Sequence, residues 1–210
     1  MALSCFSRLF SYIFLGRSLV SSSLVSSSLS VVNSERFVSI VPPCSHDYCL
    51  SFSDSALALK QDVLTALSFF PELRSFRCVV LRSSSFLMMS ARRSLVSNTL
   101  VFRFSPSFLR FSSDARVGLL LHECAHMVEY LSLSKPRLLW WYFRYICNPC
   151  FRVRKEVETD IRVFKRGGGS FLKKYVSEFF SSPFISSWRK RFRSKNYIVD
   201  FSLVDSFFSQ

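Results

Sequence analysis

The clearest pattern of hydrophobic and polar positions lies in residues 114–132. Apolar side chains recur there every three or four residues, so that all of them lie on one face of a helix. These positions are Val117, Leu120, Leu121, Ala125, Val128 and Leu131. Ser112, Ser113 or Asp114 can cap the N-terminus, because a short polar side chain accepts hydrogen bonds from the first backbone N–H groups. The pattern predicts an amphipathic helix packed against a core.

Weaker patterns predict strands and further helices around this one. Runs rich in β-branched and aromatic residues predict short strands at 37–42, 76–82, 86–90 and 99–104. Helical spacing predicts helices at 55–70, 152–166 and 170–180, and in the basic tail from 186 onward. This order predicts an α+β fold. We expect a small, mostly antiparallel sheet packed on the helix at 114–132 and on the helices after it, of which the first is at 152–166.

The segment from Leu138 to Cys147 is strongly apolar and holds two of the three tryptophans of the chain. It is interrupted by Arg144, and it is far shorter than the roughly 20 apolar residues that a membrane-spanning helix needs. Such a segment could lie at a membrane interface. Burial within the fold is the expectation.

The two ends of the chain differ in composition from its middle. Residues 1–34 contain no acidic residue, two arginines and twelve serines. This composition is typical of a targeting segment, and equally of a disordered extension that buries little apolar surface. Residues 35–185 are therefore expected to form the folded domain. Residues 186–210 form a basic and aromatic tail.

The net charge of +14 favours contact with anionic partners. Five of the basic residues lie close together in the tail, with Trp188 and Phe192 between them. They are Arg189, Lys190, Arg191, Arg193 and Lys195. A helix that carries basic and aromatic side chains can lie on an anionic membrane, although a solvated helix face is the simpler interpretation. Beyond its charge, the sequence carries no nucleic-acid-binding signature.

The chain has seven cysteines. The number is odd and the spacing is irregular, so a disulfide framework is not expected and a reducing, cytoplasmic environment fits better. Cys147 and Cys150 form a C-x-x-C pair. With ligands from Cys44, His46 and Cys49 they could hold a structural zinc ion, but free cysteines are the simpler interpretation.

The predicted helix at 114–132 contains the motif His-Glu-x-x-His, at His122, Glu123 and His126. Residues i and i+4 lie one turn apart on the same face of a helix, so both imidazoles can bind one zinc ion. The glutamate of this motif binds no metal. It takes a proton from the attacking water and passes it to the leaving amine. The sequence therefore predicts the zinc site of a metallopeptidase.

A catalytic zinc ion needs a third protein ligand. No histidine follows His126, so that ligand must be a carboxylate or a cysteine further along the chain. The helix predicted at 152–166 offers Glu156, Glu158 and Asp160. Glu156 and Asp160 are four residues apart and share a face. A different helix phase would direct Glu158 toward the metal instead.

The H-E-x-x-H motif, followed about 30 residues later by Glu-x-x-x-Asp, resembles the gluzincin metallopeptidases, most closely their small single-domain members. The resemblance covers about residues 75–170. It implies that Glu156 is the third zinc ligand and that Asp160 supports a histidine ligand through a hydrogen bond. It also implies that an edge strand lies over the helix at 114–132. By this likeness the strand at 99–104 would border the cleft and could hold an extended peptide by strand addition.

Members of this family can also carry a His or Tyr that stabilises the oxyanion of the transition state. Four side chains are candidates here, and the sequence does not select among them. They are Tyr130, Tyr142, Tyr145 and Arg154. Asp114, Glu129 and Glu178 are expected to be helix caps or solvated charges.

The expected function is hydrolysis of peptide bonds in a peptide or protein substrate, with Zn²⁺ as cofactor. The alternative is a basic adaptor at a membrane or on nucleic acid, with a zinc site that is not catalytic. The two differ at Glu123, because only the peptidase needs its carboxylate.

Overall fold

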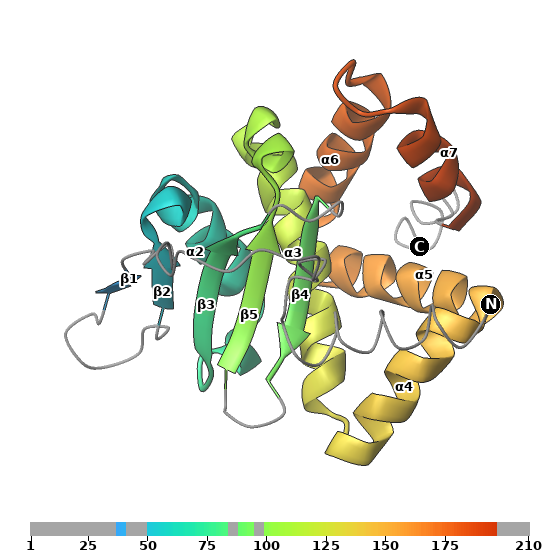
Figure 1. The fold of residues 1–210 in the computed structure, drawn as a ribbon, viewed down its shortest axis with the longest axis horizontal. Helices are drawn as coiled ribbons and strands as arrows, with labels where there is room; N and C mark the ends of the chain where they lie inside the picture. The colour runs from blue at the N-terminus through green and yellow to red at the C-terminus, as the bar shows by residue number, and fades with distance from the viewer. Residues whose placement is uncertain (1–36, 41–49, 84–87, 95–98, 197–210) are drawn as a thin grey trace, which may run out of the picture. The chain divides into compact units, whose positions relative to one another are not determined.

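The computed structural model describes residues 37–40, 50–83, 88–94 and 99–196 (Figure 1). The predicted segment 1–34, the tail beyond Asn196, and the candidate ligands Cys44, His46 and Cys49 lie outside these residues. The strands are β1 (Phe37–Ile40), β2 (Leu50–Ser53), β3 (Arg77–Arg82), β4 (Met89–Arg93) and β5 (Thr99–Phe104). The α-helices are α2 (Lys60–Ser68), α3 (Ser113–Leu131), α4 (Lys135–Cys147), α5 (Pro149–Lys165), α6 (Gly169–Ser181) and α7 (Ser187–Asn196). Short 3-10 helices span Asp54–Leu59, Pro71–Leu73 and Pro106–Arg110.

The predicted α+β class is confirmed, and the described strands form one five-stranded mixed sheet in the order β1-β2-β3-β5-β4. The outer pairs, β1 with β2 and β4 with β5, are antiparallel, whereas β2 with β3 and β3 with β5 are parallel. The last of the described strands, β5, therefore lies between β3 and β4. This arrangement makes β4 the edge strand beside the helices that follow (Figure 1).

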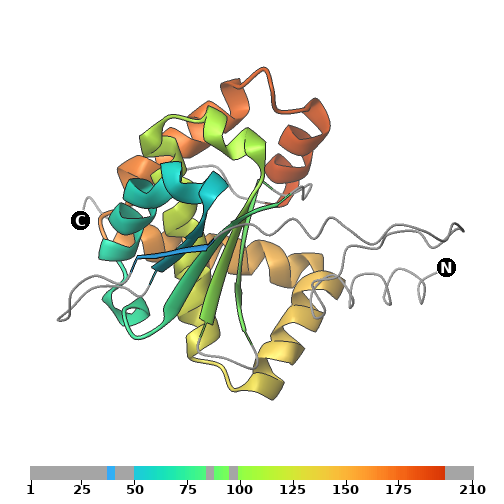
Figure 2. The ribbon, with the colours of Figure 1, turned by 60° about the vertical axis from the view of Figure 1, so that its left-hand side comes forward.

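The central helix α3 packs on one face of the sheet, and α5 extends beyond the β4 edge (Figures 1 and 2). The alternation in β5 explains this packing, because Leu100, Phe102 and Phe104 are buried while the residues between them are half-buried. Ser112 caps α3 by accepting a hydrogen bond from the Ala115 backbone N–H at 3.3 Å. The hydrophobic stripe of α3 thus faces the core, as its sequence predicts.

Helix α6 crosses α3 closely at Gly118. A Cβ atom at this position would lie 2.1 Å from the backbone oxygen of Phe171, far closer than two nonbonded atoms can approach. Only glycine fits this crossing. The contact holds α6 against the side of α3 and leaves the other faces of α3 for the sheet and for α5.

Helix α5 has well-defined signals at both ends. Asn148 caps its start by accepting a hydrogen bond from the Phe151 N–H at 2.9 Å, so the helix begins three residues earlier than the predicted 152. At its end, Gly167 has φ +80° and its N–H binds the Phe164 carbonyl at 2.9 Å. This left-handed ending is typical of glycine and fixes where the helix stops.

Four local predictions differ from the structure. The strand predicted at 86–90 is found at Met89–Arg93. Strand β2 is not predicted, because Leu50–Ser53 is too short and too serine-rich to stand out. The helix predicted at 55–70 divides into the 3-10 helix Asp54–Leu59 and α2. The segment from Leu138 to Cys147 is helical, but only one of its faces is buried.

Candidate metal centre

His122 and His126 lie one turn apart on α3 and are both buried. Their Nε2 atoms are 3.2 Å apart, and the ring centroids are separated by 4.8 Å. The i, i+4 spacing of a helix produces this pairing directly. Two imidazole nitrogens so close together in a buried site need a shared proton or a shared cation between them.

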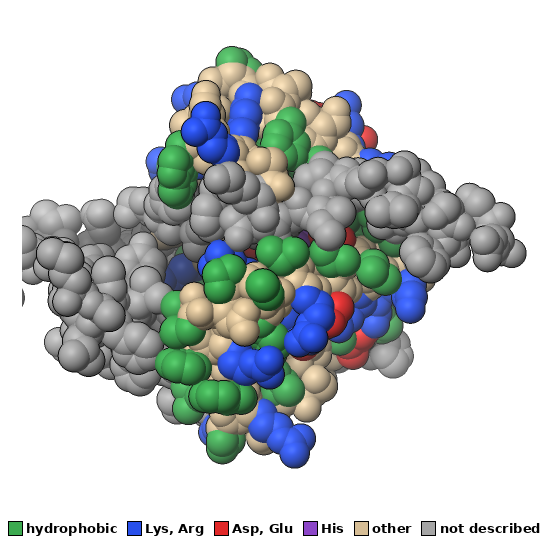
Figure 3. Space-filling model, turned by 90° about the vertical axis from the view of Figure 1, so that its right-hand side faces the viewer, with side chains coloured by type: hydrophobic (Ala, Val, Ile, Leu, Met, Phe, Trp, Pro, Cys, Tyr) green, Lys and Arg blue, Asp and Glu red, His purple; other side chains and the backbone are tan. Residues whose placement is uncertain are grey.

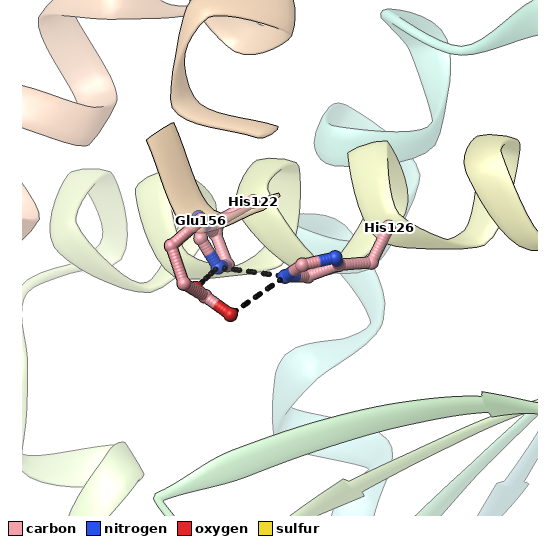
Figure 4. A group of neighbouring side chains, drawn as sticks. All are labelled: His122, His126 and Glu156. Carbon is pink, nitrogen blue, oxygen red and sulfur yellow. Dashed lines mark hydrogen bonds and ion pairs between the residues drawn. The ribbon is translucent and has the colours of Figure 1, made fainter. Parts of the chain in front are cut away.

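Helix α5 brings Glu156 to the two histidines from the opposite side (Figure 4). One carboxylate oxygen, Oε2, lies 3.0 Å from His122 Nε2, and the other, Oε1, lies 3.5 Å from His126 Nε2. All candidate ligand atoms lie within 4.8 Å of one another. This buried group of two nitrogens and a carboxylate can bind a metal ion.

Two side chains of α5 hold the imidazoles by their other nitrogens. Asp160 Oδ1 lies 2.7 Å from His122 Nδ1, and Thr159 Oγ1 lies 3.3 Å from His126 Nδ1. The Thr159 hydroxyl donates to the Lys155 carbonyl at 2.8 Å, so it is available as an acceptor for the histidine N–H. With protons on both Nδ1 atoms, both Nε2 lone pairs face Glu156, as metal ligands require.

The charges of the group stabilise one another in the absence of a cation. Burial disfavours the imidazolium of His122, but the Asp160 and Glu156 carboxylates outweigh this effect and raise the pKa of His122 to about 10. Burial likewise disfavours the Glu156 carboxylate, yet the neighbouring imidazoles hold the pKa of Glu156 well below its usual range. A metal ion bound by His122 would therefore compete with a proton for this imidazole.

The donor set suits zinc. The Glu156 carboxylate is buried, and its Oε2 lies 3.0 Å from the His122 imidazole, so either a protonated imidazole or a metal ion must balance its charge. Two histidines with one carboxylate form a three-ligand set found at catalytic zinc ions, and that set leaves one coordination position for water or substrate. A structural zinc ion would instead have four protein ligands.

Glu123 follows His122 on α3 and is half-buried, but it is not among the clustered ligand atoms. Burial is the largest influence on its carboxylate and raises its pKa, against the opposing effect of the two histidines. A hydrogen bond from the backbone of Ala91 in β4 favours the charged form. The carboxylate thus interacts with the histidines on one side and with the edge strand on the other.

The edge strand beside the site is β4, so the prediction that the strand at 99–104 borders the cleft is wrong. That strand, β5, lies inside the sheet because β3 pairs with it directly. The Met88 carbonyl accepts from the Ser105 N–H, and the Ser94 N–H donates to the Thr99 carbonyl. These two bonds show which residues along β4 bond to β5. Since alternate residues of an antiparallel strand face its partner, Ala91 directs its N–H and C=O away from β5.

The other candidates for the third metal ligand lie away from the two histidines. Glu158 points to the surface, where its carboxylate pairs with Lys155 at 2.6 Å and with Arg154 at 3.7 Å. Arg154 is itself exposed on that surface and is therefore not positioned at the metal centre. Cys147 and Cys150 are exposed and free. Within the described part of the chain, no metal-binding group forms around them.

Aromatic side chains of α4, and Tyr130 of α3, lie beside the centre. Tyr145 donates a hydrogen bond to Glu156 Oε1 and stacks on Trp141, with ring centroids 4.9 Å apart. Trp141 in turn packs edge-on to His126 at 6.3 Å. Tyr130 lies parallel to His126 at 5.9 Å. Of the oxyanion candidates, Tyr145 is the one hydrogen-bonded to a member of the group.

Glu129 is neither a cap nor a solvated charge, and that expectation is wrong. It is largely buried, accepts a hydrogen bond from Trp141 Nε1 at 2.9 Å, and pairs with Lys155 at 2.8 Å. It therefore joins α3 to α4 and α5 beside the metal centre. Glu178 does act at a helix end, because its carboxylate accepts from the Ser112 N–H at 3.0 Å.

Thr159 is the supporting residue that the sequence reasoning missed. It lies three residues after Glu156 and one before Asp160, so all three share one face of α5. The spacing i, i+3, i+4 was available as a signal. Threonine is common enough in helices that the spacing alone would not have distinguished it.

Comparison of the chain with known protein families, with characterised proteins and with solved structures finds no match. Among the described helices, none combines the length and apolar character that crossing a bilayer requires.

Proposed function

We propose that the protein is a zinc-dependent peptidase that resembles the gluzincins. The observation that carries this proposal is the arrangement of His122, His126 and Glu156 between α3 and α5, with Asp160 behind one imidazole. Two nitrogen ligands and one carboxylate ligand form one of the three-ligand sets that hold catalytic zinc and leave one position open. The burial of this carboxylate against two imidazoles supports a cation at the same point.

Zinc bound by these residues supplies a Lewis acid that makes water nucleophilic near neutral pH and polarises a carbonyl group. The protein contributes the positions of the reacting groups. Asp160 and Thr159 keep the imidazoles oriented by their Nδ1 atoms. Tyr145 restrains the Glu156 carboxylate. Such restraint matters because misplaced ligands weaken both metal affinity and catalysis.

Glu123 would act as the general base. Its pKa is raised mainly by burial, which brings it closer to the pH at which a carboxylate can both accept and return a proton. It would accept the proton of the attacking water and then donate it to the amine of the cleaved bond. No other carboxylate of α3 is suitable, because Asp114 lies in its first turn and Glu129 is paired with Lys155.

An extended peptide would bind along β4. Because the Ala91 N–H already binds Glu123, the outward-facing carbonyl of Ala91 and the backbone groups of its alternate neighbours would form the main-chain hydrogen bonds of an added strand. Arg93 fixes this edge to α3 by donating to the carbonyls of Tyr130 at 3.0 Å and Leu133 at 3.3 Å. The peptide would then pass close to Glu123 and to the metal ligands.

The test is cleavage of a mixture of synthetic peptides of varied sequence by zinc-loaded protein, read by mass spectrometry. Glu123→Gln is expected to keep its zinc and lose activity by about a hundredfold or more, because the base is removed while the ligands stay. Glu158→Gln is the matched control, since it removes an exposed carboxylate of α5, and it should leave cleavage unchanged.

The adaptor alternative makes the opposite prediction. If zinc binds but Glu123→Gln behaves as the wild type in every assay, the site is not a hydrolytic centre. Binding of a peptide hydroxamate gives a second readout, because hydroxamates engage zinc through the open position that a peptidase provides. A zinc-loaded protein that binds no hydroxamate contradicts the proposal.

A further inference from the structure

Helix α4 has two apolar faces, and only one of them is buried. Leu138 and Trp141 pack inward toward the metal centre. On the other side, Leu139, Trp140 and Phe143 have exposed fractions of 39%, 60% and 41%. The Trp140 and Phe143 rings stack, with centroids 5.2 Å apart. Figure 3 shows hydrophobic side chains gathered on this side of the molecule. A cluster of large exposed apolar groups usually marks an interaction surface.

The charged side chains of α4 itself are all basic. Between Glu129 and Glu156 the chain contains six basic residues and no acidic one. Lys135 and Arg137 are exposed in the first turn of α4. They precede Leu139 and Trp140 by four and three residues, so each cation lies one turn from an exposed apolar side chain. Long basic side chains can extend from such a position to reach a charged surface.

We propose that the exposed face of α4, defined by Leu139, Trp140 and Phe143 with Lys135 and Arg137, docks on the surface of an anionic lipid bilayer. Trp140 and Phe143 would enter the boundary between headgroups and acyl chains, and the two cations would contact the lipid phosphates. No described helix can cross a bilayer, so the contact is with one surface only.

Charge also argues against a second copy of the chain as the occupant of this face. In a symmetric dimer the same patch meets itself, so the interface would hold the cations of both chains and no acidic residue of the patch to pair with them. Like charges across an interface oppose binding. An anionic surface satisfies both the apolar and the cationic groups of the patch.

The proposal does not depend on catalysis at the metal centre, although the two sites share a helix. The buried side of α4 contacts the centre through Trp141 and Tyr145. The docking side chains point the other way. Removing them is therefore expected to leave zinc binding unchanged, and zinc content reports that the variants remain folded.

The test is cosedimentation of the full-length protein with phosphatidylcholine vesicles, with and without phosphatidylserine. Wild-type protein is expected to bind the phosphatidylserine vesicles, and added salt is expected to weaken binding because it screens the cations. The double variant Trp140→Ser/Phe143→Ser should bind about tenfold more weakly or worse, because most of the inserted apolar area is lost. The charge variant Lys135→Glu/Arg137→Glu should also bind more weakly.

Trp188→Ser is the matched control, because Trp188 has an exposed fraction of 57% on the basic helix α7. It should bind as the wild type does. Loss of binding in Trp188→Ser with full binding in the α4 variants would assign the lipid contact to α7 and overturn the proposal. Absence of phosphatidylserine-dependent binding would also overturn it. So would self-association that Trp140→Ser/Phe143→Ser abolishes in a protein that binds no vesicles.

Discussion

Asp160 offers the sharpest test of how the metal centre is supported. It accepts from His122 Nδ1 at 2.7 Å in a buried site, so Asp160→Ala removes the group that fixes the tautomer and the orientation of this ligand. Loss of such a partner weakens metal affinity by about 10- to 100-fold, or about 1.4–2.7 kcal/mol. The direct expectation is therefore a higher dissociation constant for zinc in Asp160→Ala.

A second effect of the same substitution opposes the first. Asp160 helps to raise the pKa of His122 to about 10, so at neutral pH a proton competes with zinc for this imidazole. Without Asp160 the pKa of His122 falls, and the competition weakens. While His122 is protonated, the affinity of the wild type should rise about tenfold per pH unit. The affinity of Asp160→Ala should rise less steeply, so the ratio between the two should grow between pH 7 and pH 9.

The assay is competition for zinc with a chromophoric chelator at several pH values. Glu158→Gln, an exposed neighbour on α5, should follow the wild-type curve throughout. Equal zinc affinity in the wild type and Asp160→Ala at every pH would refute the role assigned to this hydrogen bond. A ratio that shrinks as the pH rises would refute the proton competition.

Three other predictions follow from single contacts. Tyr145→Phe removes the hydrogen bond to Glu156 and should weaken zinc binding by about tenfold; titration with the same chelator measures this. Gly118→Ala should lower the free energy of unfolding by about 1–3 kcal/mol, because its Cβ would overlap the Phe171 carbonyl. Urea denaturation measures this change. Gly168→Ala is the comparison, because the nearest neighbours of a Cβ atom there are side-chain atoms. Zinc at about 100 times its dissociation constant should stabilise the fold by about 2.7 kcal/mol, and His126→Ala should abolish the zinc-dependent shift in melting temperature.

The parts of the fold that the sequence predicted are those with a strong local pattern. The stripe from Val117 to Leu131 forms α3, and the alternation of Leu100, Phe102 and Phe104 forms β5, almost at the predicted bounds. The i, i+4 spacing of His122 and His126 is a property of one helix, so their convergence needs no knowledge of tertiary structure.

The features that could not be predicted from local patterns depend on contacts between elements far apart in the sequence. That β5 inserts between β3 and β4 depends on pairing across the sheet, and this order decides which strand borders the centre. The burial of Glu129 depends on Trp141 and Lys155, which come from two other helices. Sequence periodicity reports only that an apolar helix such as α4 must bury one face, and it does not reveal that the other remains exposed.

The measurement that tests the central claim most directly is zinc content by elemental analysis of purified, folded protein. The wild type and Glu158→Ala are expected to hold about one zinc ion per chain. His126→Ala and Glu156→Ala are expected to hold almost none, because a site with two remaining ligands binds zinc weakly. Folded wild-type protein without zinc, even after zinc is supplied, would contradict the account, and so would full zinc content in Glu156→Ala.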